Sequence, residues 1–328
     1  MVKPSIRYDR TIPGEFRAEL GPGGTFERLV RFARGRHLAD VQLRAVGSRS
    51  WATIYCGLTN VLHVEYRRKR GYRLRADDRH MTANKAGPPE GILGWTTWST
   101  PAQLMARWPA IEAYMAGQFN VVAPRWTNEG AVQAMLCANG GESYQVIDRE
   151  AVFDFRDTAE RERIHKALRT PLLEALDVPT PERWWRPPAS LGGELDILAV
   201  DAGGRLLVME VKPADNLPGI TWAPLQVSFY ARLFRHWSEA VGEKSAEVLS
   251  GMLRQRIAIG LEKETAVSLS YPLKIVPVIA IQDPVAHPRA LAQLQAVQAQ
   301  LLKAGQGDDD LEVWLVDPDM AIKHHPLG

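Results

Sequence analysis

Two carboxylates and a lysine lie at short spacing in the second half of the chain, within segments that are otherwise apolar. Asp196 is in a predicted strand over residues 195–200, Glu210 is in a predicted strand over residues 206–211, and Lys212 follows it. Side chains alternate between the two faces of a strand, so Glu210 and Lys212 share a face that is apolar before them. A buried carboxylate at such a position needs a partner, a cation or solvent, which makes this segment a candidate for chemistry.

The turn between the two strands decides whether the two carboxylates meet. If residues 202–204 form a three-residue loop, Asp201 faces Arg205 and the residue numbers of each pair sum to 406. Asp196 then lies opposite Glu210. A slip of one residue would send the two carboxylates to opposite faces, because the side-chain period of a strand is two. We therefore expect Asp196 and Glu210 to lie side by side on an antiparallel hairpin.

Two adjacent carboxylates favour a divalent cation. They repel each other and would hold a proton between them unless a cation neutralises the pair. Carboxylate oxygens are hard ligands, which favour Mg²⁺ or Mn²⁺. Lys212 would point into the same pocket, where an ammonium group can orient a water nucleophile and stabilise the charge that grows on a phosphate.

A helix after the hairpin extends this pattern. We expect it over residues 224–240, with Pro224 in its first turn. Gln226 and Tyr230 are four residues apart and therefore share a face of this helix. The combination of Asp, Glu-x-Lys and Gln-x-x-x-Tyr resembles the PD-(D/E)XK nuclease superfamily, in the branch that is RecB-like or archaeal mismatch-endonuclease-like. The resemblance covers about residues 190–235.

The resemblance implies a fold, an activity and roles for individual residues. The fold would be α/β, with a restriction-endonuclease-like mixed sheet flanked by helices. The activity would be metal-dependent hydrolysis of phosphodiester bonds, with DNA favoured over RNA as the substrate. The residues with implied roles are the metal ligands Asp196, Glu210 and the Val211 carbonyl, and the catalytic residues Asp196, Glu210, Lys212 and Gln226. Leu195 departs from the family pattern, which often has Pro before the Asp.

An acidic residue of an N-terminal helix often joins the site in this superfamily. The helix predicted over residues 158–176 offers three candidates, Glu160, Glu162 and Glu174. We favour Glu160, because it shares a face with the apolar Ile164. On the alternative interpretation all three are charges on a solvated face.

Two more residues are candidates for an accessory role. Glu194 is two residues before Asp196 and shares its strand face, so it would be an additional ligand or would lie in solvent before the strand. Tyr230 is the other candidate, because it shares a helix face with Gln226.

The remaining elements divide the chain into two predicted domains. Residues 1–150 are expected to be β-rich, with strands over residues 40–46, 51–56, 61–66 and 72–76 and a helix over residues 101–115. Residues 151–328 are expected to be the α/β nuclease-like domain, with the helix over residues 158–176, the hairpin, the helix over residues 224–240, a strand over residues 273–281, a helix over residues 288–303 and a strand over residues 311–316.

Positive charge is concentrated in the first domain, which has a net charge of +7 against −5 for the second. Its densest part is residues 65–75, where Tyr66 and Tyr72 lie among the cationic residues Arg67, Arg68, Lys69, Arg70, Arg73 and Arg75. This composition suits a phosphate backbone and stacked bases, so nucleic acid is the expected partner. The alternative is a solvated hairpin with cationic edges.

Composition excludes several classes of protein. The 328 residues are 45% hydrophobic and 24% charged, which is typical of a globular protein. No apolar run approaches the roughly 18 residues of a membrane helix, and no secretory signal follows the N-terminus. We therefore expect a cytoplasmic protein with no membrane partner, of either monomeric or homo-oligomeric state. The rival to a nuclease is a non-catalytic module that uses the same fold to bind nucleic acid or another protein.

Overall fold

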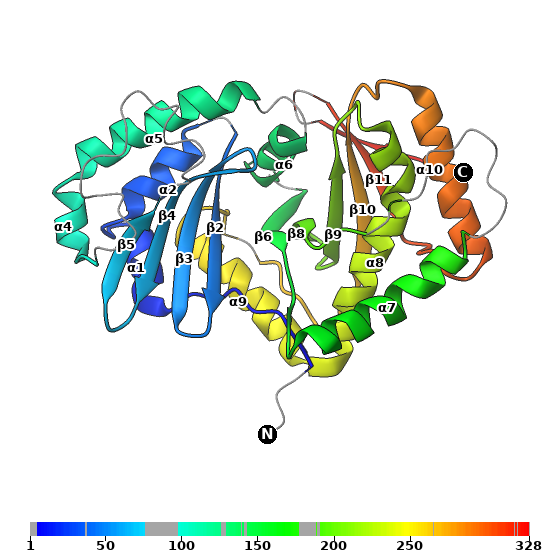
Figure 1. The fold of residues 1–328 in the computed structure, drawn as a ribbon, viewed down its shortest axis with the longest axis horizontal. Coiled ribbons are helices and arrows are strands. Elements are labelled where there is room, and N and C mark those ends of the chain that lie inside the picture. Colours follow the sequence, from blue (N-terminus) through cyan, green and yellow to red (C-terminus); the bar gives the residue numbers. More distant parts are fainter. Residues whose placement is uncertain are drawn as a thin grey trace. The chain divides into compact units, whose positions relative to one another are not determined.

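A computed structural model shows the fold of the chain (Figure 1). The residues that it describes are 5–36, 38–75, 98–125, 129–138, 140, 143–176, 188, 191–264, 266–317, 319 and 321–327.

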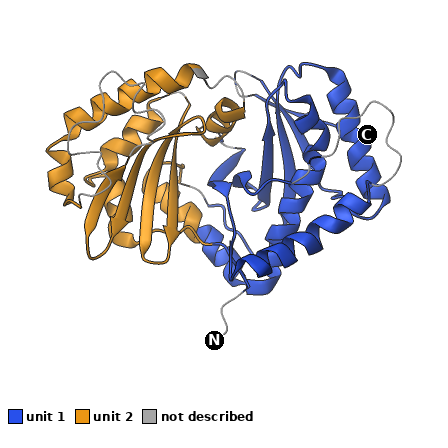
Figure 2. Cartoon of the chain, viewed as in Figure 1, with its two compact units in different colours: residues 1–8, 140–250, 266–328 blue, residues 9–139, 251–265 orange. Residues whose placement is uncertain are grey.

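The chain divides into two compact units (Figure 2). Unit 1 consists of residues 1–8, 140–250 and 266–328, and unit 2 consists of residues 9–139 and 251–265. The main boundary lies near residue 140, whereas we expected it at residue 150. Each unit also includes a segment from the other part of the sequence, because long-range packing, rather than chain order, decides which residues share a core.

Unit 2 is built on a four-stranded antiparallel sheet, and its strands match the four predicted ones. In order across the sheet they are β2 Ala39–Val46, β3 Arg49–Cys56, β4 Thr59–Arg67 and β5 Gly71–Arg75. Ala76, where we expected the last strand to end, lies outside the described residues. Each strand pairs with the next in the sequence, so turn chemistry and period-two alternation were sufficient to locate them.

One face of this sheet is apolar and forms the core of unit 2. Val41, Ile54, Leu62 and Val64 are all buried on it. The same core includes side chains of described helices of unit 2, among them α1 Gly14–Leu20, α2 Glu27–Arg34, α4 Pro101–Met105, α5 Trp108–Val122 and α6 Glu129–Ala138. The 3-10 turn Ala123–Arg125 follows α5. The opposite face of the sheet therefore carries the alternate, ionisable side chains.

The helix predicted over residues 101–115 is two helices, α4 and α5. Pro109 has no N–H to donate to the carbonyl four residues earlier, so it cannot continue α4 and instead lies in the first turn of α5. The apolar stripe that predicted the helix is nevertheless buried, with Leu104, Trp108, Ile111 and Met115 in the core.

Unit 1 contains a six-stranded mixed sheet, so the α/β class is confirmed. Its strand order is β12-β11-β10-β9-β8-β6, with β9, β10 and β11 mutually parallel and the other pairs antiparallel. The bounds are β6 Tyr144–Ala151, β8 Leu195–Asp201, β9 Leu206–Lys212, β10 Ile275–Gln282, β11 Glu312–Val316 and β12 Ile322–His325. A separate short pair joins β1 Ile6–Arg7 to β7 Asp154–Phe155.

The described part of the chain contains four more long helices, namely α7 Thr158–Glu174, α8 Leu217–Val241, α9 Lys244–Ala258 and α10 Pro288–Lys303. α8 packs against β9 and β10 and also contacts α7 and α10. The positions of α7 and α10 were predicted, whereas α9 was not. None of the described helices is long and apolar enough to cross a bilayer.

The start of α8 differs from the prediction, which placed it at Pro224. The helix begins at Leu217, because the side chain of Asn216 accepts a hydrogen bond from the Gly219 N–H at 3.0 Å and caps the first turn. Pro218 takes the first-turn position that we assigned to Pro224. Pro224 lies inside the helix and leaves one carbonyl of the preceding turn without its usual N–H.

Candidate functional site

The β8–β9 hairpin has the predicted register. Ile197 pairs with Met209 and Val200 with Leu206, so the residue numbers of each pair sum to 406. The Asp201 N–H donates to the Arg205 carbonyl at 3.1 Å, which closes the three-residue loop. One step beyond the Ile197 pair, this register brings Asp196 next to Glu210 on one face of the sheet.

Asp196 is held in place by the backbone of the facing strand. The Val211 N–H donates to Asp196 Oδ2 at 2.6 Å, where a continued ladder would have used a backbone carbonyl. The N–H and C=O of one strand residue point to the same side of the strand, so the Val211 carbonyl is also directed toward β8. The three metal ligands that the resemblance implies, Asp196, Glu210 and the Val211 carbonyl, are therefore neighbours in this structure.

Glu210 and Lys212 form a buried pair on the same strand face. The Lys212 ammonium lies 2.6 Å from Glu210 Oε1. Glu210 is 4% exposed and Lys212 is 5% exposed. The other oxygen, Glu210 Oε2, is buried and has no hydrogen-bond partner among the described residues. A buried carboxylate oxygen without a partner is costly. This oxygen is a donor of the kind that Mg²⁺ or Mn²⁺ accepts, so the residues present fit such a cation.

α8 brings Gln226 and Tyr230 to the same site. A Cβ added to Gly192, just before β8, would lie 2.6 Å from the Tyr230 hydroxyl and 3.8 Å from Gln226 Nε2. Gly192 has a φ of +83°, a conformation that favours glycine. The close approach of this backbone to α8 therefore places both side chains of the Gln-x-x-x-Tyr pattern against the segment that leads into Asp196.

Tyr230 stays protonated in this environment. It is buried, and its pKa is raised first by burial and then by the negative charges of Glu210 and Asp196. The backbone of Glu194 also forms a hydrogen bond with its hydroxyl. A neutral phenol beside two carboxylates orients groups by hydrogen bonding and does not act as a base at neutral pH.

The remaining acidic candidates are Glu194 and three glutamates of α7. Glu194 is exposed, and its accessory role stays a prediction. Glu160 lies in the first turn of α7, where its carboxylate binds Arg163 at 2.8 Å and Arg156 at 3.5 Å. The hydrogen bond from Arg163 lowers the pKa of Glu160. The two competing residues of the helix, Glu162 and Glu174, are exposed.

A cation at this site would rely on few protein ligands. Over the described ranges, no group of three or more His, Cys, Asp or Glu side chains is arranged to hold a metal ion. The protein would therefore supply two carboxylates and one carbonyl, and water would complete the coordination. Mg²⁺ usually keeps several waters and binds through one or two carboxylates.

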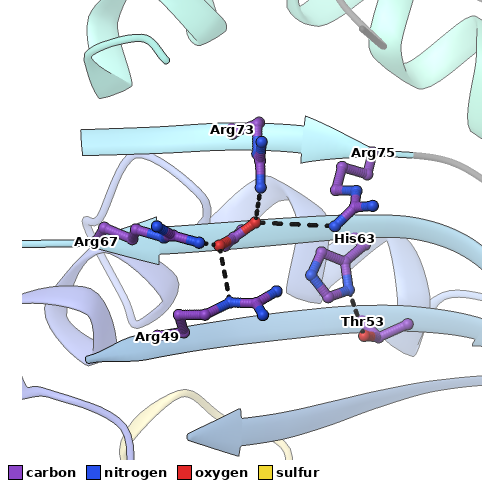
Figure 3. Close-up of polar contacts among 7 residues, drawn as sticks. Arg49, Thr53, His63, Arg67, Arg73 and Arg75 are labelled. Carbon is purple, nitrogen blue, oxygen red and sulfur yellow. Dashed lines mark hydrogen bonds and ion pairs between the residues drawn. The ribbon is translucent and has the colours of Figure 1, made fainter. Parts of the chain in front are cut away.

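The basic segment of unit 2 is organised around a carboxylate that we did not include among the site residues. Glu65 is fully buried, and four arginines surround it (Figure 3). Arg67 Nε lies 3.0 Å and Arg49 Nε 3.2 Å from Glu65 Oε1. Arg73 binds the other oxygen, and Arg75 lies 4.0 Å from it. We call Glu65 and these four residues, Arg49, Arg67, Arg73 and Arg75, the arginine cluster.

The predicted basic hairpin is therefore two different surfaces. Arg67, Arg73 and Arg75 belong to the arginine cluster on the sheet face, whereas Arg68, Lys69 and Arg70 are exposed at the turn. Arg68 is 90% exposed and lies 3.8 Å from Glu15. Arg49 was missing from the prediction because it comes from β3. The register of the strands was the available signal. β3 pairs Trp51 with Glu65, and Arg49 is two residues before Trp51 on the same face of the strand.

The expectation that Tyr66 and Tyr72 would stack on bases is wrong. Both are buried, at 7% and 6% exposure, on the apolar face of the sheet. They contact each other, with ring centroids 5.0 Å apart, and Phe16. Even-numbered residues of this strand pair face the core while the odd-numbered arginines face away, so the tyrosines and the arginine cluster lie on opposite sides of the sheet.

No family model matches the sequence, and no curated protein and no solved structure is significantly similar to it.

Proposed function

We propose that this protein is a metal-dependent nuclease that hydrolyses phosphodiester bonds, in DNA rather than RNA. The observation that carries the proposal is the hairpin register, which brings Asp196 of β8 to the same face of the sheet as Glu210 and Lys212 of β9, with Glu210 Oε2 buried and without a partner among the described residues. A sheet face that served only for packing would place apolar side chains there.

The chain's own residues have distinct tasks in this reaction. Asp196 is held in a defined orientation by the Val211 N–H. Lys212 stabilises negative charge on the phosphate and orients the attacking water, while it offsets the charge of Glu210. Gln226 has both a donor and an acceptor, so it can position the substrate from α8.

A bound Mg²⁺ or Mn²⁺ would lower the pKa of a water molecule and offset charge in the transition state. Asp196, Glu210 and the Val211 carbonyl would hold it.

The test compares cleavage of circular single-stranded DNA, linear duplex DNA and RNA, each with Mg²⁺, Mn²⁺ or EDTA. We expect metal-dependent cleavage of DNA by the parent protein. Glu210→Gln and Lys212→Met should each lower the rate by roughly 10²- to 10³-fold, the usual cost of removing one preorganised charge-stabilising group. Calorimetry should show that Lys212→Met retains most of the Mg²⁺ affinity and that Glu210→Gln loses it.

Glu239→Gln is the matched control, because Glu239 is an exposed carboxylate near the end of α8. It should cleave at the parent's rate. Cleavage by Glu210→Gln at that same rate would identify a contaminating nuclease and contradict the proposal. A folded parent that binds nucleic acid but cleaves none of the three substrates with either metal would be a binding module.

A further inference from the structure

Arg49 and Arg67 are the most exposed members of the arginine cluster, with side chains that are 46% and 32% exposed. Both guanidinium groups lie against the same oxygen of Glu65, so one carboxylate oxygen faces two partly exposed cations. Burial raises the pKa of Glu65, but the hydrogen bonds and charges of Arg73, Arg67 and Arg49 outweigh it and lower the pKa to about 2. Glu65 is therefore ionised at neutral pH and holds the guanidinium groups together, while the partly exposed Arg49 and Arg67 attract anions.

Among the described residues, the neighbouring ionisable groups of this face are His63, Arg44 and Asp40. His63 pairs with Arg75 across the strands, and burial together with the charge of Arg75 lowers its pKa to about 4, so it is neutral at pH 7. Arg44, on the same row of the sheet as Trp51, adds a further cation. Asp40, the nearest acidic residue on β2, lies 3.8 Å from Arg256.

Two tryptophans lie among these cations. Trp51 is half-buried beside Glu65 in the sheet, with the Arg49 guanidinium 5.7 Å from its ring centroid. Trp98 is also half-buried, and the guanidinium groups of Arg73 and Arg67 lie 4.7 Å and 5.4 Å from its ring. Guanidinium groups bind phosphate oxygens with two parallel hydrogen bonds, and indole rings stack on bases.

We propose that this sheet face binds single-stranded nucleic acid, with Arg49 and Arg67 on the phosphates and Trp51 on a base. The proposal rests on the proposed function, because it names the form in which the substrate is captured. A flat strand face can reach bases only when they are unpaired, since the bases of a duplex are stacked inside it. A duplex would offer this face phosphates alone.

Binding in EDTA separates this proposal from the nuclease activity. The probe is a labelled oligodeoxythymidylate, and fluorescence anisotropy measures its affinity for the full chain over a range of salt concentrations. Arg49→Gln/Arg67→Gln should weaken binding and lower the slope of log affinity against log salt by about 0.7 for each phosphate that the variant no longer binds. Trp51→Leu should weaken binding by about fivefold to a hundredfold, the range for one stacked base, with the salt slope unchanged. A matched duplex should bind less tightly than the oligodeoxythymidylate.

Arg28→Gln/Arg34→Gln is the control with the same loss of charge, because both arginines are exposed on α2, which packs in the core on the other side of the sheet. This control should bind like the parent. Equal affinities and salt slopes for the two double variants would overturn the proposal, as would tighter binding of the duplex.

Further measurements distinguish a loss of binding from misfolding and from a loss of cleavage. Circular dichroism checks that the Arg49/Arg67 variant is folded, and Arg49→Lys/Arg67→Lys, which keeps the charge at both positions, should retain the parent's salt slope. A lower slope in the lysine variant would contradict binding of phosphate at these positions. If EDTA binding follows these expectations but no metal supports cleavage, the binding face stands and the nuclease proposal fails.

Discussion

His63 shows how burial controls an ionisable residue beside the arginine cluster. Thr53 Oγ1 lies 3.2 Å from its Nδ1, and its Nε2 is buried without a hydrogen-bond partner among the described residues. Burial is the main cause that lowers its pKa to about 4, and the nearby charges of Arg75, Arg49 and Arg73 add to it while that of Glu65 opposes it. The folded protein therefore resists protonation of this ring.

This gives a prediction for stability against pH. The pKa of His63 is about 6.5 in the unfolded chain, so between pH 6.5 and 4 the unfolded chain binds a proton at this residue and the folded protein does not. The contribution of neutral His63 to stability is therefore complete above pH 6.5 and is lost as the pH falls toward 4. The decrease in stability is about 3 kcal/mol. Urea unfolding at several pH values should show a steeper loss of stability in the parent than in His63→Gln across this window. Parallel curves for the two proteins would mean that His63 titrates normally.

At the scale of elements, the fit between the segment before β8 and helix α8 determines the site. Gly192 approaches the Tyr230 hydroxyl so closely that a methyl group there would lie 2.6 Å from it, and its φ is +83°. Gly305 has a similar φ, +66°, but nothing lies within 4 Å of the Cβ position. A comparison of substitutions at the two glycines therefore separates the energetic cost of backbone strain from the cost of close contact.

We expect Gly305→Ala to cost about 1 to 2 kcal/mol, the strain of a left-handed residue. Gly192→Ala should cost at least about 1 kcal/mol more, because it also overpacks against Tyr230. Tyr230→Phe removes the hydroxyl that the new methyl meets, so it should recover part of the cost in the Gly192→Ala background. Urea unfolding of the single and double variants measures this coupling, and additive costs would show that the two elements do not touch there.

At the scale of the whole molecule, the two proposed sites lie in different units. Asp196, Glu210 and Lys212 belong to unit 1, and the arginine cluster belongs to unit 2. A metal that binds the folded state alone stabilises it by mass action, by about 2.7 kcal/mol when its concentration is 100 times its Kd. Binding at Asp196 should therefore be visible as thermal stabilisation.

The expected result is a Tm that is several degrees higher in Mg²⁺ than in EDTA for the parent, and the same in both for Asp196→Asn. The same variant should bind single-stranded DNA in EDTA with the parent's affinity, because its substitution lies in unit 1. An equal response of Asp196→Asn and the parent to Mg²⁺ would contradict the ligand assignment.

The local features of the candidate site could be predicted from the sequence. A loop of three small residues and strict alternation gave the register of β8 and β9, and this register alone brings Asp196 beside Glu210. The four strands of unit 2 were found for the same reason, since each pairs with its neighbour in the sequence. Period-two patterns and turn residues act over a few positions, so the sequence displays them directly.

Tertiary structure alone decided the rest. It placed β6 in the sheet of unit 1 and residues 251–265 in unit 2, and it gathered Arg49 with Arg73 and Arg75 around Glu65. It also turned Tyr66 and Tyr72 into the core, although their spacing among arginines suggested base stacking. These outcomes depend on contacts between residues that are distant in the sequence, where burial and pairing with partners from other strands outweigh local composition.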